Sequence, residues 1–282
     1  MAASDIKVTP SGASLGASVT GVNLSSPLTA DEIAAIRAAW LEHLVLAFPG
    51  QKMNHADLER FTRYFGPFGD DPFIAPIEGH PHIIEVKREA NEKASVFAAA
   101  WHSDWSFQDV PPAGTILHSK ITPPVGGDTL FCNGYAAYEA LSDEMKAKLE
   151  GLEAIHSAAL AYAPDGVYGE NDAKDRSMTI KSSEDARNTR AHPIVRVHPE
   201  TGRKTLFINP GYVKTVKGLT DEEAFFLLVE LYGVTHDERF VYRHKWEKDM
   251  LLMWDNRCTQ HMATGGYDGH ARLMHRTTVA GP

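Results

Sequence analysis

The chain has 282 residues, 43% of them hydrophobic, and a formal net charge of −9. This length and apolar content are enough for one domain with a large core over residues 1–282, and the acidic balance argues against nucleic acid as a partner. No apolar run approaches the roughly 18 residues of a membrane span, no secretory segment opens the chain, and two cysteines give no disulfide framework, so we expect a cytoplasmic protein with no membrane partner.

The first predicted elements are a helix and a buried strand. Thr29 and Glu32 have the spacing of a capping box, and the apolar residues after them recur at helical intervals. Residues 44–48 then form an apolar run that a Pro-Gly pair ends, which is typical of a buried strand. Further helical patterns cover residues 54–65, 134–150 and 220–233.

Strands dominate the later part of the chain. Runs with strand character lie near residues 82–87, 113–120, 128–132, 193–198, 204–208, 239–246, 250–254 and 272–279. Many short strands with Gly and Pro turns are typical of a double-stranded β-helix rather than of alternating βαβ units. We therefore predict a mixed α/β fold that is mainly β, with a cupin-like jelly-roll core and flanking helices.

Residues 163–190 differ from the rest, because they are polar and charged and contain few apolar anchors. A long polar insertion inside a compact domain is usually an active-site lid or a disordered surface loop. We favour the lid, since the insertion follows the region that carries the metal motif described next.

The stretch Trp101-His102-Ser103-Asp104-Trp105 is the most informative motif. A His and an Asp two residues apart on an extended strand point to the same face, so both side chains could bind one metal ion. A distant histidine, His261, completes a 2-His-1-carboxylate set. In non-haem Fe(II) oxygenases such a set leaves coordination positions open for substrate and dioxygen.

Two similar patterns elsewhere serve as controls. His55 and Asp57 lie in a predicted helix, where residues two apart are turned roughly 200° from each other and cannot share a metal. His198 and Glu200 lie between two strand-like runs, so we predict an exposed hairpin tip there. Context therefore singles out the pair His102 and Asp104.

Several separated motifs carry a family resemblance over nearly the whole chain. In chain order these are Trp101-His102-Ser103-Asp104, Pro111-Pro112-Ala113-Gly114, Gly126-Gly127-Asp128-Thr129-Leu130, Ala136-Ala137-Tyr138-Glu139-Ala140-Leu141, His192-Pro193-Ile194-Val195-Arg196-Val197-His198-Pro199, Trp254-Asp255-Asn256-Arg257 with His261, and Arg272-Leu273-Met274-His275-Arg276. The chain resembles the TauD/TfdA group of Fe(II)/2-oxoglutarate-dependent dioxygenases, which includes taurine dioxygenase, alkylsulfatases and aryloxyalkanoate dioxygenases.

The resemblance implies roles for the matching residues. His102, Asp104 and His261 would bind Fe(II) as the catalytic centre. Thr129 and Arg272 would hold the distal carboxylate of 2-oxoglutarate, for which an Arg offers a planar pair of donors. Dioxygen would be the second co-substrate, and hydroxylation of a C–H bond would yield succinate and carbon dioxide. The resemblance also implies a homo-oligomer, either a dimer or a tetramer.

The prime substrate is predicted to be a small to medium organic anion. In the family, the second arginine, Arg276 here, contacts the acidic group of the substrate. Asp71, Ile74 and Ala98 match positions that contact taurine in its dioxygenase, and Tyr162 aligns with an aromatic on the substrate side. Asp71 could instead face solvent, and Tyr162 could be a core residue.

These residues predict a more apolar pocket than taurine needs. An alkyl sulfonate, a sulfate ester or an aryloxyalkanoic acid fits it better, and hydroxylation beside a heteroatom would release that group.

Two other functions compete with this prediction. A non-catalytic, metal-binding jelly roll would keep the fold and lose the reaction, but the three metal-binding residues and both 2-oxoglutarate residues are all present. A hydrolytic zinc site would leave Thr129 and the two arginines without a purpose, although the metal-binding residues alone do not exclude zinc.

Overall fold

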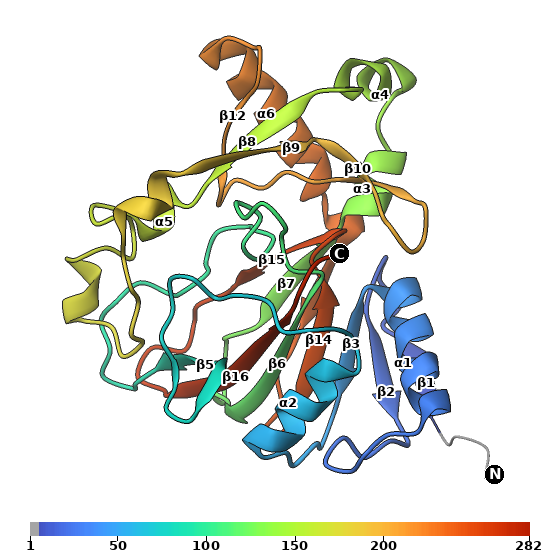
Figure 1. Ribbon diagram of the computed structural model, residues 1–282, viewed down its shortest axis with the longest axis vertical. Helices are drawn as coiled ribbons and strands as arrows, with labels where there is room; N and C mark the ends of the chain where they lie inside the picture. Colours follow the sequence, from blue (N-terminus) through green and yellow to red (C-terminus); the bar gives the residue numbers. More distant parts are fainter. Residues whose placement is uncertain (1–5) are drawn as a thin grey trace.

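The computed structural model describes residues 6–282, so the first five residues of the predicted domain lie outside the described part (Figure 1). The fold is mixed and mainly β. Its largest sheet has eight strands in the order β1-β2-β3-β14-β6-β16-β5-β4. Among the strands of residues 6–282, only β2 and β3 pair in parallel within this sheet. The strands are β1 (Lys7–Pro10), β2 (Ala17–Thr20), β3 (Val45–Phe48), β4 (Pro76–Ile77), β5 (His80–Arg88), β6 (Gly114–Ile121), β14 (Leu251–Asp255) and β16 (Arg272–Val279).

A smaller antiparallel sheet faces this large one. Its strands, in the order β13-β7-β15, are β13 (Val241–His244), β7 (Thr129–Asn133) and β15 (Thr259–Ala263). Phe131 of β7 packs in one buried cluster with Leu117 of β6, Trp254 of β14 and Met274 of β16. The two sheets therefore share one core, and the space between them is where side chains from both can converge.

A third layer lies at the top of Figure 1. It combines the sheet β12-β8-β9 with the hairpin β10-β11. The elements are β8 (Glu153–Ser157), β9 (Thr189–Pro193), β10 (Val195–Val197), β11 (Lys204–Leu206) and β12 (Val213–Val216). The helices α3 (Gly134–Glu139), α4 (Asp143–Leu149) and α6 (Asp221–Thr235) contribute to its separate apolar core.

Local sequence explains where the long helices begin. α1 (Ala30–His43), α2 (His55–Arg63) and α6 each start with a capping box, in which the cap side chain and a carboxylate three residues later satisfy each other's backbone amides. The caps are Thr29, Asn54 and Thr220. α1 and α2 cover the outer face of the large sheet, where Trp40 and Phe61 belong to the same buried cluster as Met253. The predicted helices 54–65 and 220–233 and the buried strand 44–48 are confirmed.

Other predictions need correction. The predicted helix 134–150 is two helices, because Ser142 accepts the amide of Met145 and starts α4 anew. β1, β2, β4, β8, β9, β12 and β15 were not predicted, since such short strands of two to five residues leave little periodicity to detect. Among residues 6–282, no helix is both long and apolar enough to cross a membrane.

The segment 163–190 packs against the loop before β4. It contains the short helices η1 (Asp172–Lys174) and η2 (Glu184–Arg187), and it follows α5 (Ala159–Tyr162). Ile180 forms an isolated bridge with Ile74, and the Lys181 amide donates to the Phe73 carbonyl at 2.8 Å. The segment is thus attached to the fold by backbone hydrogen bonds rather than by side chains alone.

Candidate active site

The structure brings together the three predicted metal-binding side chains. His102 Nε2 lies 3.6 Å from Asp104 Oδ1, and His261 Nε2 lies 3.9 Å from the same oxygen. One possible ligand atom from each residue lies within 4.8 Å of the others. The three residues are only 6%, 2% and 6% exposed. Such a buried group of two imidazoles and one carboxylate is a candidate metal centre.

The way in which His102 and Asp104 converge differs from the prediction. His102 does not lie on a long strand, because it forms an isolated antiparallel bridge with His261 in which each amide donates to the other's carbonyl, at 3.0 and 2.8 Å. Asp104 begins a turn, and Trp105 has a positive φ of 48°. The bridge places the two histidines side by side, and the turn brings the carboxylate back to them.

Hydrogen bonding leaves the facing atom of His102 free. Its Nδ1 lies 2.8 Å from the Ala100 carbonyl, which can only accept, so Nδ1 carries the proton and Nε2 presents a lone pair toward Asp104. Burial, followed by the proximity of His102, lowers the pKa of His261 to about 3. His261 is therefore neutral near pH 7, which is the form that binds metals.

A buried hydrogen-bond chain holds the carboxylate of Asp104. Thr115 Oγ1 donates to Asp104 Oδ2 at 2.6 Å, and Asn256 Nδ2 donates to Thr115 Oγ1 at 2.9 Å. Trp254 Nε1 in turn donates to Asn256 Oδ1 at 2.9 Å. These hydrogen bonds explain the motif at Trp254, whose residues hold Asp104 in place but are not themselves candidate metal ligands. Thr115 was not predicted, because a single Thr in an apolar strand gives no signal in the sequence.

The charge of Asp104 is stabilised in spite of its burial. Burial by itself raises the pKa of this carboxyl, but the Arg276 guanidinium and the two histidines outweigh that effect and hold the pKa well below its usual range. Oδ1 therefore faces the histidines as an anion.

Thr129 and Arg272 lie on opposite sheets and both contact Trp246. Trp246 Nε1 donates to Thr129 Oγ1 at 3.0 Å, and the Arg272 guanidinium lies 5.8 Å from the centre of the Trp246 ring. Arg272 is 6% exposed, and its guanidinium makes no hydrogen bond or ion pair with residues 6–282. Burial lowers its pKa. A buried guanidinium without a counter-ion is costly, so an anionic ligand would stabilise it.

Arg276, four residues further along β16, is already paired. Its Nη2 donates to Asp71 Oδ1 at 2.6 Å, and its Nη1 lies 3.4 Å from Asp104 Oδ1. Trp105 Nε1 donates to the same oxygen of Asp71 at 2.8 Å. The Asp71 side chain is 8% exposed, so the alternative in which Asp71 faces solvent is wrong.

The remaining predicted substrate residues lie in two places. Ala98 and Tyr162 line a cavity of about 340 Å³ that reaches His102. Tyr162 also stacks on Phe73, so it is both a wall residue and a core residue. Ile74 is buried in that same core and does not line the cavity.

The rim of this cavity contains a strained residue. Ala98 has a positive φ of 61°, which is unfavourable for a residue with a side chain. Its amide donates to Tyr168 Oη at 2.9 Å, and its carbonyl accepts from the Ala263 amide at 2.9 Å. Tyr168 belongs to the segment 163–190, so part of the predicted lid lines the cavity. Together with Leu160, Val167 and Tyr212 it makes the lining largely apolar and aromatic.

The control patterns behave differently. His55 and Asp57 lie on α2 as predicted. The exposed hairpin tip is wrong for His198, which is 2% exposed and donates from Nε2 to Asp255 Oδ2 at 3.0 Å. His198, Asp255 and Cys258 lie close enough for a metal. However, Arg257 already donates to both oxygens of Asp255, at 2.8 and 2.7 Å, so this group is a structural ion-pair network.

Comparison with known proteins decides the family. Residues 7–278 match the model of the family described as taurine catabolism dioxygenase TauD, TfdA family. The chain belongs to the TauD/TfdA family.

Individual members of the TauD/TfdA family match over similar lengths. An alpha-ketoglutarate-dependent sulfate ester dioxygenase of Pseudomonas putida is 32% identical over 98% of this chain and 90% of its own. A (S)-phenoxypropionate/alpha-ketoglutarate-dioxygenase of Sphingobium herbicidovorans is 31% identical, with 97% and 94% covered. The crystal structure of a taurine dioxygenase from Burkholderia xenovorans superposes with a TM-score of 0.82 at 32% identity, covering 98% of this chain and 90% of that one.

The family settles the class of reaction. Its members named above use alpha-ketoglutarate, that is 2-oxoglutarate, together with dioxygen. The protein is an oxidoreductase, a 2-oxoglutarate-dependent dioxygenase.

Proposed function

We propose that His102, Asp104 and His261 bind Fe(II) and that the enzyme hydroxylates a C–H bond of an organic anion. The observation that carries this proposal is the convergence of His102 Nε2, His261 Nε2 and Asp104 Oδ1, three possible metal-binding atoms of which two belong to side chains fixed by hydrogen bonds, His102 and Asp104. Three protein atoms on one side of a metal leave the other side open for co-substrates.

We further propose that Thr129 and Arg272 bind the distal carboxylate of 2-oxoglutarate. Arg272 is a buried cation without a partner among residues 6–282, and a carboxylate would supply the missing counter-ion through two parallel hydrogen bonds. Thr129 Oγ1 already accepts from Trp246, which leaves its own proton available to the same carboxylate.

The chemistry divides between the bound groups and the chain. Bound Fe(II), with 2-oxoglutarate and dioxygen, supplies the oxidation that converts a substrate C–H bond to C–OH and releases succinate and carbon dioxide. His102 is oriented through Ala100, and Asp104 through Thr115, so both are held before any ligand arrives. Tyr162 and Tyr212 narrow the cavity and keep bulk water from the reacting carbon.

The substrate that we propose is an organic anion with a substantial apolar part, such as an alkyl sulfonate, an alkyl sulfate or an aryloxyalkanoate. The named relatives act on sulfate esters and phenoxypropionate. Ala98 and Tyr162 would contact the substrate, since they line the cavity beside His102. Taurine fits poorly, because no Asp or Glu from residues 6–282 lines this cavity to receive its ammonium group.

Several coarser features complete the proposal. The two facing sheets would form a double-stranded β-helix within a single domain, and residues 163–190 would act as a lid over the cavity. Cys132 and Cys258 are buried free thiols, which fits a reducing compartment such as the cytoplasm. Assembly into a dimer or tetramer is a prediction that analytical ultracentrifugation tests.

The experiment combines binding and turnover. Adding 2-oxoglutarate to anaerobic Fe(II) protein should produce a visible metal-to-ligand charge-transfer band, and adding oxygen should yield succinate. His102→Ala should lose both signals. The band could form while no succinate appears, either without substrate or with any class of organic anion tested. That result would instead support the non-catalytic metal-binding module. No band at all would contradict the proposed site.

A further inference from the structure

Arg276 lies beside the candidate metal centre, 3.4 Å from Asp104, and forms an ion pair with Asp71. The ion pair joins Nη2 and Oδ1 at 2.6 Å, with side chains only 6% and 8% exposed. Because the pair is shielded from water, its attraction is much stronger than that of a surface pair, and removing Asp71 would leave Arg276 with only the more distant Asp104, 3.4 Å away.

Neighbouring groups fix Asp71 in this position. Trp105 donates from Nε1 to Oδ1, and Thr278 Oγ1 lies 3.4 Å from Oδ2. The Trp105 ring also lies under the Arg276 guanidinium, 5.0 Å from its carbon to the ring centre. Trp105 adopts its positive φ of 48° while making both contacts, so the surroundings hold the pair even at a cost in backbone strain.

A second hollow adjoins the cavity beside His102, and we call the two the outer hollow and the inner cavity because His102 lines only the latter. The inner cavity of about 340 Å³ and an outer one of about 590 Å³ share Leu160, Val167, Gly211 and Tyr212 as lining residues. No lysine or arginine from residues 6–282 lines the inner part. A ligand reaching from the outside to His102 would thus lie against an apolar wall along its inner length.

The outer hollow contains two cations in different states. Arg187 is bound to Asp165 at 2.8 Å and to Glu184 at 2.7 Å. Lys214, exposed on β12, has no carboxylate partner among residues 6–282. Lys214 is therefore the cation of the two that is free to receive an acidic group.

We propose that Asp71 closes Arg276 to substrates, and that the acidic group of the substrate binds at the outer end of the cavity, at Lys214. The substrate class is an extended amphiphile, a medium-chain alkyl carboxylate, sulfate or sulfonate whose oxidised carbon lies several bonds from the acidic group. One atom of dioxygen enters the C–H bond and the other enters succinate as 2-oxoglutarate loses carbon dioxide. Because the new hydroxyl is remote from the acidic group, the sulfate of an alkyl sulfate stays attached. This inference rests on the proposed function.

The first experiment asks whether Asp71 blocks an anion site. Full-length protein with Fe(II) and 2-oxoglutarate is kept anaerobic and its melting temperature is measured with methanesulfonate or with the neutral methanesulfonamide. Neither should shift the wild type. In Asp71→Asn, saturating methanesulfonate should raise the melting temperature by about 5 °C and methanesulfonamide should not. An equal rise in wild type would overturn the role of Asp71, as would no rise in a folded Asp71→Asn.

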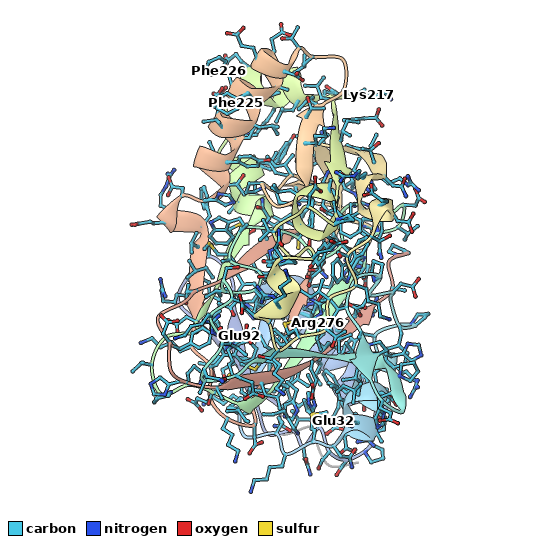
Figure 2. All side chains as sticks on the ribbon, turned by 90° about the vertical axis from the view of Figure 1, so that its left-hand side faces the viewer. Glu32, Glu92, Lys217, Phe225, Phe226 and Arg276 are labelled. Carbon is cyan, nitrogen blue, oxygen red and sulfur yellow. The ribbon has the colours of Figure 1, made fainter. Side chains whose placement is uncertain are left out.

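The second experiment does not depend on Asp71→Asn folding. Succinate formation is measured with octyl sulfate and with octanoate for wild type, Lys214→Gln and Lys217→Gln. Lys217 is a matched control, because it follows the same strand but is paired with Glu153 and lies far from Arg276 (Figure 2). Lys214→Gln should raise KM about fivefold, the effect of one exposed charge pair, and Lys217→Gln should leave KM unchanged.

Three results would overturn the inference. These are equal KM values for the two lysine variants, release of sulfate in step with succinate from octyl sulfate, and no stimulation by either amphiphile. The charge-transfer band with 2-oxoglutarate separates this failure from a failure of the proposed function. If the band forms, only the inference is wrong, and if it is missing in wild type, the proposed site is wrong.

Discussion

Arg272 and Arg276 lie on the same strand, β16, four residues apart and almost equally buried at 6% and 5%, yet their surroundings are opposite. Arg272 has an aromatic neighbour and no counter-ion among residues 6–282, and burial lowers its pKa. For Arg276, burial acts in the same direction, but Asp71 and Asp104 outweigh it and raise the pKa. A buried cation without a counter-ion indicates a place where a ligand's negative charge would be stabilising. A buried cation that already has a counter-ion indicates a place where no such charge is needed.

Removing the cation of Arg272 gives the largest expected effect. Arg272→Leu should weaken 2-oxoglutarate binding by about 2–5 kcal/mol, because the distal carboxylate loses its charged partner. Titration of the charge-transfer band measures it. 2-Oxobutanoate, which lacks the distal carboxylate, is the control and should bind wild type and variant equally. If the affinity of Arg272→Leu for 2-oxoglutarate equalled that of the wild type, the assignment of Arg272 to the distal carboxylate would be wrong.

For the unfolding free energy, we expect the larger effect at the pair of Asp71 with Arg276 and the smaller effect at Arg272. Asp71→Ala should cost about 3 kcal/mol of unfolding free energy, because it removes the closer of the two carboxylates beside the buried Arg276, while Arg272→Leu should cost little or nothing. Urea denaturation measures both. Adding Arg276→Met to Asp71→Ala should recover only part of the loss, because Arg276 also stabilises the buried Asp104. A similar loss in Arg272→Leu would mean that Arg272 has a structural partner after all.

The hydrogen bond from Thr115 to Asp104 gives a prediction about metal affinity. Thr115→Val keeps the shape of the side chain and removes the hydroxyl that donates to Asp104, so Fe(II) affinity should fall about 10- to 100-fold. Ser119→Ala on the same strand is the control, since its hydroxyl donates to the Glu247 carbonyl instead. Equal metal affinities in the two variants, measured by competition with a chelator, would remove Thr115 from the site.

We expect acid to lower the unfolding free energy through two buried histidines, His156 and His244, that pair with neither arginine. Burial, and for His156 also His192, lowers the pKa of His156 to about 3, and burial lowers that of His244 to about 4. As pH falls below the unfolded value of about 6.5, only the unfolded chain takes up these protons, so the unfolding free energy should fall by up to about 1.4 kcal/mol per pH unit for each. The loss should level off near pH 3 to 4.

Urea midpoints between pH 7.5 and 5 measure this slope. His156→Gln should flatten it, and the exposed His270→Gln should not. An unchanged slope in His156→Gln would assign the acid sensitivity to other groups. Comparisons of the two arginines are therefore best made above pH 6.5.

Local signals and long-range pairings differ in how well sequence predicts them. The capping box at Thr29 and the helix of His55 depend only on near neighbours, and both were predicted. Thr129 and Arg272 were found through spaced motifs. The pairing of Asp71 with Arg276 spans 205 residues and depends on how a loop meets β16, which no local pattern encodes. His198 likewise became buried because Asp255, 57 residues away, offered it a partner.

Ala98 has a consequence for how the cavity opens. Its unfavourable φ is held between Tyr168 of the segment 163–190 and Ala263, two residues after His261. If that segment moves away, Ala98 loses one constraint and its backbone can relax by about 1 kcal/mol, which offsets part of the hydrogen bonding lost on opening. If residues 163–190 act as the proposed lid, the closed form stores a small amount of conformational energy next to the candidate metal centre and releases it on opening.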